Sequence, residues 1–201
     1  MMNLVFDLGN VLLTYEHLNY VKQFVSDPVR AEAVDRAIFS HPKRPELDRG
    51  TMTDADLIPV MIADAPAFED DIRRIMANWL EMIGPKPDGQ QLLRDAVAQG
   101  IPCYYLSNYP EEGFRVTAAR MGFLELFTDG IISAPYRVVK PEPAIYRLFL
   151  ERCGLKAEEC IFMDDMPENV AAAQAEGFNS FVFTTGEAAR RILREEYGLP
   201  L

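Results

Sequence analysis

Cysteine is scarce in this sequence, and the three cysteines present do not form a recognisable framework. Cys103, Cys153 and Cys160 are odd in number among 201 residues and show no C-x-x-C spacing. This pattern excludes a disulfide-stapled scaffold and gives no sign of a zinc site. We therefore expect reduced thiols and a cytoplasmic location.

Positive charge is scarce as well. Lys and Arg number 20 against 31 Asp and Glu, which gives a formal net charge of -11 and a pI of about 4.7. A chain with this balance repels nucleic acid and anionic membrane surfaces, so we expect neither as a partner. A phosphorylated ligand would need a local cation in order to bind.

Long apolar runs are absent too. The first apolar run has no basic segment before it and is interrupted by Asp7, which does not fit a signal peptide, and no later run approaches the length of a membrane span. A hydrophobic fraction of 49% with 25% charged residues is typical of a globular protein. The sequence predicts one substantial core, or a core with a modest insertion.

What the sequence does contain is an alternation of strands and helices. Apolar runs predict strands, and stretches that end at glycine or begin at proline predict helices. Parallel strands joined by right-handed crossovers follow from this alternation, so we expect an α/β fold with a Rossmann-like, doubly wound parallel sheet. The predicted strands are residues 4–6, 101–106, 130–133, 160–163 and 181–183, and the predicted helices are residues 88–99, 111–121, about 140–153, 168–176 and 187–197.

The segment of residues 15–82 has a different character. It shows no convincing strand, its apolar residues recur at helical spacing, and its prolines limit each helix to a few turns. Ile83-Gly84-Pro85-Lys86-Pro87 is expected to be the hinge by which the chain leaves this helical unit. The predicted organisation is therefore a core of residues 1–14 and 85–201 with an inserted small helical cap of residues 15–84.

Polar side chains follow the predicted strands where each strand ends. Asp7 follows the first strand in the stretch NLVFDLGNVLL, and Ser107, Lys140 and the pair Asp164-Asp165 occupy similar positions. Each of them alone is explained as well by a turn or a helix cap. Together they should meet in one crevice, because the carboxyl ends of parallel strands share one edge of the sheet.

Such a crevice would suit phosphoryl transfer. Three carboxylates placed together repel one another unless a cation compensates them, and oxygen ligands alone favour Mg²⁺. Lys140 supplies a second positive charge, and Ser107 supplies a hydroxyl that can hold a phosphate. The carboxylate of Asp7 can then attack phosphorus in line and form an aspartyl-phosphate.

Four stretches of the chain resemble the four motifs of the haloacid dehalogenase superfamily, in order and at suitable spacing. They are VFDLGNVL, YYLSN, VVKPEPAIY and FMDDMPENVAAA. The sequence is similar to the branch that has a small helical cap after the first strand, a DLGNV first motif and the DD-x-x-x-N form of the last motif. That branch includes bacterial α-D-glucose 1-phosphate phosphatases and the N-terminal phosphatase domain of soluble epoxide hydrolase.

The resemblance implies a role for each matched position. It implies that Asp7 is the nucleophile, that Lys140 screens charge between phosphate and nucleophile, and that the cap covers the site and selects the leaving group. The remaining implied roles are phosphate binding by Ser107 with Asn108 beside it, Mg²⁺ binding by the carbonyl of Gly9 and by Asp165 with Asp164, and support of the metal by Asn169.

One position departs from the pattern that the resemblance implies. Most phosphatases of the superfamily carry a second Asp two residues after the nucleophile, where it protonates the leaving oxygen, and this chain has Gly9 there. General acid catalysis is typically worth about 10²- to 10⁴-fold. Either the substrate has a good leaving group, such as the anomeric oxygen of a sugar 1-phosphate, or a cap residue such as His17 or His41 supplies the proton.

Other cap residues are candidates for substrate contact or for structure. Arg44, Arg49 and Tyr20 are candidates to face the substrate, although the sequence does not orient them. Thr53 is expected to cap the following helix. Trp79 lies on an apolar helical stripe and is expected in the core of the cap rather than under a sugar.

The sequence thus predicts a magnesium-dependent phosphomonoester hydrolase of small phosphorylated metabolites, with sugar phosphates such as glucose 1-phosphate as the leading class. A metal-free 2-haloacid dehalogenase is the first alternative, and Asp164-Asp165 disfavours it because such a site gains nothing from extra negative charge. The second is a non-catalytic phosphate-binding or regulatory protein, suggested by Gly9. A monomer and a homodimer both remain open.

Overall fold

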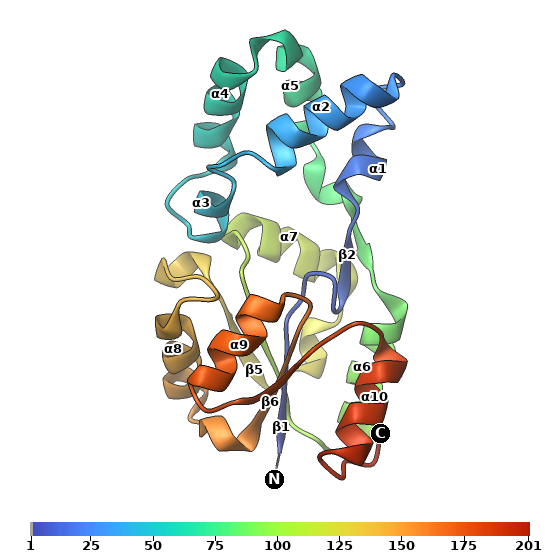
Figure 1. Ribbon diagram of the computed structural model, residues 1–201, viewed down its shortest axis with the longest axis vertical. Helices are drawn as coiled ribbons and strands as arrows, with labels where there is room; N and C mark the ends of the chain where they lie inside the picture. The colour runs from blue at the N-terminus through green and yellow to red at the C-terminus, as the bar shows by residue number, and fades with distance from the viewer. Residues whose placement is uncertain (1) are drawn as a thin grey trace.

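The computed structural model describes residues 2–201, in which a five-stranded parallel sheet forms the centre of the lower half of the molecule (Figure 1). The strand order is β5-β4-β1-β6-β7, so the first strand lies in the middle. The expectation of an α/β fold with a doubly wound parallel sheet is confirmed. The strands are β1 (Asn3–Phe6), β4 (Cys103–Ser107), β5 (Asp129–Ile132), β6 (Cys160–Asp164) and β7 (Asn179–Val182).

Helices cover both faces of this sheet. In β1, Leu4 and Phe6 belong to one fully buried apolar cluster and Val5 to the other, as expected where successive side chains alternate between faces. The first cluster includes residues of α6 (Pro87–Ala98) and α10 (Gly186–Glu195), and the second includes residues of α8 (Pro143–Cys153) and α9 (Pro167–Ala175). The sheet is therefore buried on both sides, which positions its strand ends rigidly.

The remaining helices, except α7 (Glu111–Met121), lie above the carboxyl edge of the sheet, and we use the word cap for residues 15–84 that contain them (Figure 1). Thr53 caps α4 through a capping box with Asp56, as predicted. Pro59 lies inside α4 rather than at its end, where the full burial of Leu57 and Met61 holds the helix in place. The cap helices are α1 (His17–Val21), α2 (Pro28–Phe39), α3 (Pro45–Asp48), α4 (Asp54–Asp64) and α5 (Glu69–Met76).

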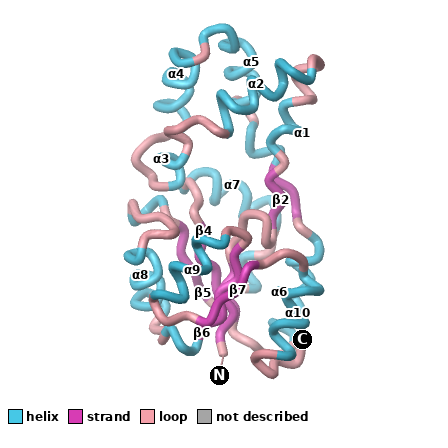
Figure 2. The backbone as a smooth tube through the Cα atoms, in the orientation of Figure 1, coloured by secondary structure: helices cyan, strands magenta, loops and turns pink. Residues whose placement is uncertain are grey.

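The segment expected to be the exit hinge of the cap forms part of a strand pair. β2 (Leu13–Tyr15) and β3 (Ile83–Pro85) pair antiparallel (Figure 2). Next to this pair, Lys86 N donates to Leu12 O at 2.9 Å. Each strand has three residues, which is too short for an alternating pattern to be visible in the sequence. The chain thus enters and leaves the cap through one paired ribbon.

Trp79 also departs from its predicted surroundings. It begins a short 3-10 turn, Trp79–Met82, rather than continuing α5 (Glu69–Met76). It is buried as expected, and its indole Nε1 donates to Asp54 Oδ2 at 2.8 Å.

Within residues 2–201, no helix is both long enough and apolar enough to cross a bilayer.

Candidate active site

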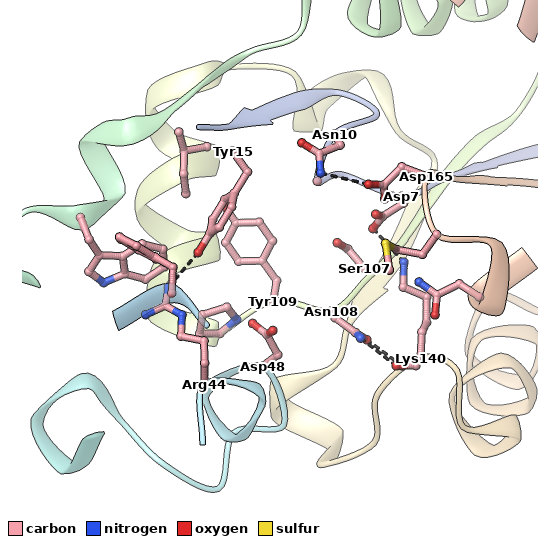
Figure 3. A pocket seen from close by; sticks show the side chains of 17 residues that line it. Asp7, Asn10, Tyr15, Arg44, Asp48, Ser107, Asn108, Tyr109, Lys140 and Asp165 are labelled. Atoms are coloured by element: carbon pink, nitrogen blue, oxygen red, sulfur yellow. Dashed lines mark hydrogen bonds and ion pairs between the residues drawn. The ribbon is translucent and has the colours of Figure 1, made fainter. Parts of the chain in front are cut away.

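The predicted strand-end residues meet at the carboxyl edge of the sheet. Asp7 follows β1 directly and is held by its N–H, which donates to Met163 O at 2.9 Å, while Ser107 ends β4 and Asp164 ends β6. Lys140 comes from the segment between β5 and α8. Asp7, Ser107 and Lys140 border a pocket of about 350 Å³ between the sheet and the cap (Figure 3).

Lys140 links the acidic groups of this site. Its Nζ lies 2.8 Å from Asp7 Oδ1 and 2.6 Å from Asp164 Oδ2, and it donates to Leu106 O at 3.0 Å. Burial acts to lower the pKa of Lys140, but Asp7 and Asp164 outweigh burial and raise that pKa. The lysine therefore carries a fixed positive charge beneath the pocket.

The carboxylate of Asp7 is buried among other charged groups. Burial raises its pKa from 3.8 to about 6, Lys140 opposes that rise, and Asp164 adds to it. Asp7 Oδ1 forms the ion pair with Lys140 but has no hydrogen bond of good geometry. Asp7 also borders the pocket, so its carboxylate lies where a nucleophile would be needed.

Asp164 and Asp165 are adjacent but engage different partners. Asp164 is fully buried, and its Oδ1 accepts from the N–H of Met166 at 2.8 Å, while Asn169 Nδ2 donates to both of its oxygens at 3.0 and 3.1 Å. Asp165 Oδ2 accepts from Asn10 Nδ2 at 2.9 Å. Burial raises the pKa of Asp165, which shows that its charge is incompletely compensated by the protein.

The three acids suit a divalent cation. One oxygen from each of Asp7, Asp164 and Asp165 lies within 4.8 Å of the other two. Three negative charges face the single charge of Lys140, and burial, with a smaller contribution from Asp164, raises the pKa of both Asp7 and Asp165. All donors are oxygen atoms, which matches the preference of Mg²⁺. The residues present therefore fit this ion.

Two asparagines shape the loops around the pocket. Asn108 forms a reciprocal pair of hydrogen bonds with the backbone of Lys140, accepting from its N–H at 2.7 Å and donating to its C=O at 2.9 Å. Its amide is thus engaged in positioning the lysine. Asn10 was missed as a site residue; it adopts a left-handed φ of 52°, for which Asn is among the better suited residues, and this directs its side chain to Asp165.

The cap side of the pocket is aromatic with one arginine. The Arg44 guanidinium lies 4.3 Å from the centre of the Trp79 ring and 5.3 Å from that of Phe39, and Arg44 Nη2 donates to Tyr15 Oη at 2.9 Å. The structure thus brings Arg44 to the pocket, with Trp79 serving both the cap core and the pocket wall. Tyr15 and Tyr109 were missed because the sequence gives no signal of which aromatic residues face inward.

Other cap candidates lie elsewhere. His17 Nδ1 contacts Asp35 at 2.5 Å and His41 Nε2 contacts Asp64 at 3.1 Å, and neither histidine borders the pocket. Arg49 pairs with Glu142 of the core at 2.7 Å. Tyr20 donates to Asn78 O at 2.9 Å within the cap.

One further acid borders the pocket and was missed as a site residue. Asp48, the last residue of α3, lies on the cap side of the space that Asp7 faces from the core (Figure 3). In the sequence Asp48 stands in the stretch Asp48-Arg49-Gly50, away from the predicted strand ends, so no pattern singled it out.

Comparison with known proteins agrees with this geometry. A family model described as haloacid dehalogenase-like hydrolase matches residues 1–177. The chain is 26% identical over 194 residues to sesquiterpene phosphatase astK of Aspergillus oryzae, covering 96% of this chain and 95% of that protein. It is 27% identical over 128 residues to phosphoglycolate phosphatase of Rhodospirillum rubrum, covering 62% of this chain but only 53% of that protein.

Solved structures share the fold at low identity. The HAD family enzyme of Bacteroides thetaiotaomicron in complex with magnesium and inorganic phosphate superposes with a TM-score of 0.65 at 20% identity, over 92% of this chain and 96% of that chain. L-2-haloacid dehalogenase of Xanthobacter autotrophicus superposes with a TM-score of 0.69 at 20% identity, over all of this chain and 85% of that chain. The α/β architecture with helices above the strand ends is thus common to all three proteins.

Proposed function

This chain belongs to the haloacid dehalogenase-like hydrolases, and we propose from that premise that it is a magnesium-dependent phosphatase of small phosphorylated metabolites that works through an aspartyl-phosphate on Asp7. The observation that carries the proposal is the placement of the Lys140 ammonium between Asp7 and Asp164, with Asp165 as a third acid at the same edge. A site of this charge pattern binds a phosphate dianion only together with a cation.

Each residue has a place in the proposed reaction. Lys140 and the Ser107 hydroxyl hold the phosphate oxygens, and Asp7 attacks phosphorus in line with the leaving oxygen. Asn108 positions Lys140 through its two hydrogen bonds to that residue's backbone. Water then hydrolyses the aspartyl-phosphate and restores the Asp7 carboxylate.

We propose that Asp7, Asp165 and the carbonyl of Gly9 hold Mg²⁺. Bound there, the ion would neutralise charge on the phosphate and on the carboxylates. Asp164 completes the acidic set, and because its oxygens already accept hydrogen bonds it contributes chiefly its charge and its hold on Lys140 and Asn169. Asn169 supports the metal site through Asp164.

The two alternatives fit the site less well. A dehalogenase attacks a substrate that bears a carboxylate, and Asp164 and Asp165 would repel it in the absence of a metal. A non-catalytic binding protein would have no use for a carboxylate held at the pocket wall by a buried lysine. Both therefore rank below phosphoester hydrolysis.

The cap side of the pocket favours a polyhydroxylated leaving group, so we propose sugar phosphates as the leading substrate class. Arg44 Nη1 is buried without a hydrogen-bond partner among residues 2–201. Sugar hydroxyls would satisfy it while the sugar ring lies against Trp79 or Tyr15. A sesquiterpenyl phosphate, suggested by the relative that matches over nearly its whole length, would match the aromatic wall but leave Arg44 Nη1 without a hydrogen-bond partner.

We also propose that residues 15–84 act as the cap and residues 1–14 and 85–201 as the catalytic core. The cap supplies Arg44 and Trp79 to the pocket, and the core supplies the strand-end acids. A cytoplasmic location, where phosphorylated metabolites are found, remains part of the proposal. A monomer and a homodimer are both compatible with it.

A substrate screen tests the proposed function. Phosphate release is measured from glucose 1-phosphate, glucose 6-phosphate, phosphoglycolate and farnesyl phosphate, with Mg²⁺ and with chelator. We expect release from at least one sugar phosphate with Mg²⁺ alone, and a loss of about 10⁴-fold or more in Asp7→Asn, because the covalent step then has no nucleophile. Release from none of these esters, or halide release from 2-chloropropionate in the presence of chelator, would contradict the proposal.

Metal binding has a readout apart from activity. At about 100 times its dissociation constant, Mg²⁺ should stabilise the fold by about 2.7 kcal/mol, which raises the melting temperature by about 5 to 10 °C for a chain of this size. Asp165→Asn should abolish most of that rise. Glu168→Gln, which changes an exposed acid close by in the sequence, is the matched control and should keep the rise.

A further inference from the structure

Proton supply at the leaving oxygen is unexplained by the strand-end residues. An alcohol oxygen leaves phosphorus with difficulty as an alkoxide, and a positioned acid lowers that barrier. Asp7 is the proposed nucleophile, and Asp165 is a proposed metal ligand that already binds Asn10. Gly9 carries no side chain at all. The acid must therefore come from elsewhere on the pocket wall.

Asp48 is the remaining carboxyl group on that wall. The carboxyl-bearing residues that border the pocket within residues 2–201 are Asp7, Asp48 and Asp165, and no histidine borders it. Asp48 and Asp7 face the same open space from opposite sides, one from the cap and one from the core (Figure 3). In an in-line displacement the acid belongs on the side opposite the nucleophile, which is the side that Asp48 occupies.

The core fixes the position of Asp48. Ser133 Oγ donates to the backbone carbonyl of Asp48, and the neighbouring Arg49 pairs with Glu142 at 2.7 Å. Gly50 passes so close to Ala134 that an added Cβ would overlap the Ala134 carbonyl oxygen. Three successive cap residues are thus docked on the core, and the side chain of the first of them is left to face the pocket.

The Asp48 carboxyl group itself is unengaged. No hydrogen bond or ion pair within residues 2–201 uses its side-chain oxygens, whose charged neighbours are Arg44 of the cap and Lys140 of the core. Burial raises its pKa from 3.8 to about 6, against the opposing effect of both cations. A group of this kind exchanges protons readily near neutral pH.

The two tyrosines that also border the pocket are poorer acids. Burial raises the pKa of Tyr109 to about 12, and it raises the pKa of Tyr15 as well. Tyr109 Oη is engaged with Thr117 Oγ1 at 3.1 Å, and Tyr15 Oη accepts from Arg44. Neither hydroxyl is placed to donate and regain a proton as easily as a free carboxyl group.

We propose that Asp48 is the general acid and base of this enzyme, a role that rests on the proposed phosphatase function. In the first step Asp7 forms a bond to phosphorus, the bond from phosphorus to the ester oxygen breaks, and the proton of Asp48 passes to that oxygen. In the second step Asp48, now a carboxylate, accepts a proton from water while the water oxygen bonds to phosphorus and the bond from phosphorus to the Asp7 oxygen breaks. Phosphate leaves, and Asp7 and protonated Asp48 are restored.

Asp48→Asn tests this assignment because it keeps the shape and removes the proton. For an alkyl ester such as glucose 6-phosphate we expect kcat/KM to fall by about 10²- to 10⁴-fold. For p-nitrophenyl phosphate, whose leaving group needs no proton, kcat/KM should fall by less than about 5-fold. Hydrolysis of the aspartyl-phosphate then becomes slow for this ester, so one equivalent of nitrophenolate should appear as a burst.

A second variant supplies an acid at Gly9, the position where most phosphatases of the superfamily carry one. An added Cβ at Gly9 meets nothing closer than Asp7 Oδ2 at 3.9 Å, so Gly9→Asp is sterically tolerated. Placed in the Asp48→Asn background, it should restore at least about 10-fold of the lost alkyl-ester activity, since a lost acid is replaced by an acid. Glu46→Gln, a change to another acid of α3 that does not border the pocket, is the control and should behave as wild type.

The outcomes separate this proposal from the one on which it rests. A wild-type enzyme that hydrolyses phosphomonoesters while Asp48→Asn shows no loss, or the same loss for alkyl and aryl esters, overturns the role of Asp48 and leaves the phosphatase function standing. A wild-type protein that hydrolyses none of the esters overturns both. Tyr15→Phe with the leaving-group dependence expected of Asp48→Asn would transfer the role to Tyr15.

Discussion

The Lys140 ammonium lies 2.8 Å from Asp7 Oδ1 and 2.6 Å from Asp164 Oδ2, and water does not screen either ion pair because all three residues are buried. A buried charge that loses its partner is costly, typically by about 3–5 kcal/mol. Removal of the lysine would leave two such charges together. The residue that orients the proposed nucleophile is thus also required for the stability of the core.

We expect Lys140→Met to lower the free energy of unfolding by about 3–5 kcal/mol at pH 7.5. The loss should shrink as the pH falls to about 5, because burial raises the pKa of Asp7 to about 6 and Asp7 is then mostly protonated. Urea denaturation at the two pH values measures the difference. Lys156→Met at an exposed position is the control and should change stability by less than about 0.5 kcal/mol. Equal losses at both pH values would contradict this account.

At Asp48 we expect a substitution to raise the free energy of unfolding rather than to lower it. Its folded-state pKa is raised from 3.8 to about 6, so the folded state binds this proton more tightly than the unfolded state and loses stability as the pH rises between those values. That interval corresponds to at most about 3 kcal/mol, and to less because the residue is only partly buried. Asp48→Asn should therefore be more stable than wild type at pH 7.5 and gain little at pH 4. A destabilised variant at pH 7.5 would contradict the prediction.

Among the elements, those of the core were predictable and the connection to the cap was not. Each of the five sheet strands was expected within two residues of its observed bounds, because an apolar run next to a glycine or an acid is a local signal. The same signal placed Asp7, Ser107 and Asp164 at strand ends. Their meeting followed from the geometry of a parallel sheet, without knowledge of any contact.

What could not be predicted depends on contacts between residues far apart in the sequence. Arg49 and Glu142 are 93 positions apart, and Ser133 and Asp48 are 85 apart. No local pattern indicates that α3 packs on the core at these residues. For that reason the sequence directed attention to His17 and His41 as proton donors, whereas the structure places Asp48 at the pocket.

Gly50 gives a test of this docking. It has a φ of 70°, and an added Cβ would overlap the Ala134 carbonyl, so Gly50→Ala should displace α3 from the core. Gly122 has a similar φ of 62° with nothing within 4 Å of an added Cβ. Gly122→Ala therefore measures the backbone strain alone, about 1 kcal/mol. We expect Gly50→Ala to be less stable than this control and to lose at least about 10-fold in kcat/KM for an alkyl phosphate. Equal stability and equal activity of the two variants would show that the docking of α3 on the core matters for neither.

On the scale of the whole molecule, the net charge of -11 opposes the approach of an anionic substrate. The cations that we propose to hold the substrate, Lys140 and Arg44, border the pocket and act at short range. Salt should screen the long-range repulsion more than these close contacts, because the Debye length falls from about 30 Å at 0.01 M to about 8 Å at 0.15 M ionic strength.

We therefore expect kcat/KM for a sugar phosphate to rise about 2-fold when KCl is increased from about 10 mM to about 150 mM at constant Mg²⁺. Steady-state rates at low substrate concentration measure this. The same series with p-nitrophenyl phosphate as the substrate separates effects on encounter from effects on the leaving group. A fall with added salt would show that a positive local field, rather than the overall negative charge, governs encounter.

The paired ribbon of β2 and β3 has a consequence for how this protein is assembled from parts. Tyr15 and Ile83 are direct partners in that ribbon, so the cap begins and ends at adjacent points. The whole cap is therefore the loop of a β-hairpin, and Tyr15 and Ile83 of this hairpin border the pocket. Such a loop can be shortened to a tight turn, or exchanged for another, without changing the order or the connections of the strands in the sheet. Under the proposed function, substrate choice and phosphoryl chemistry thus belong to two segments, the cap and the core, that can be varied separately.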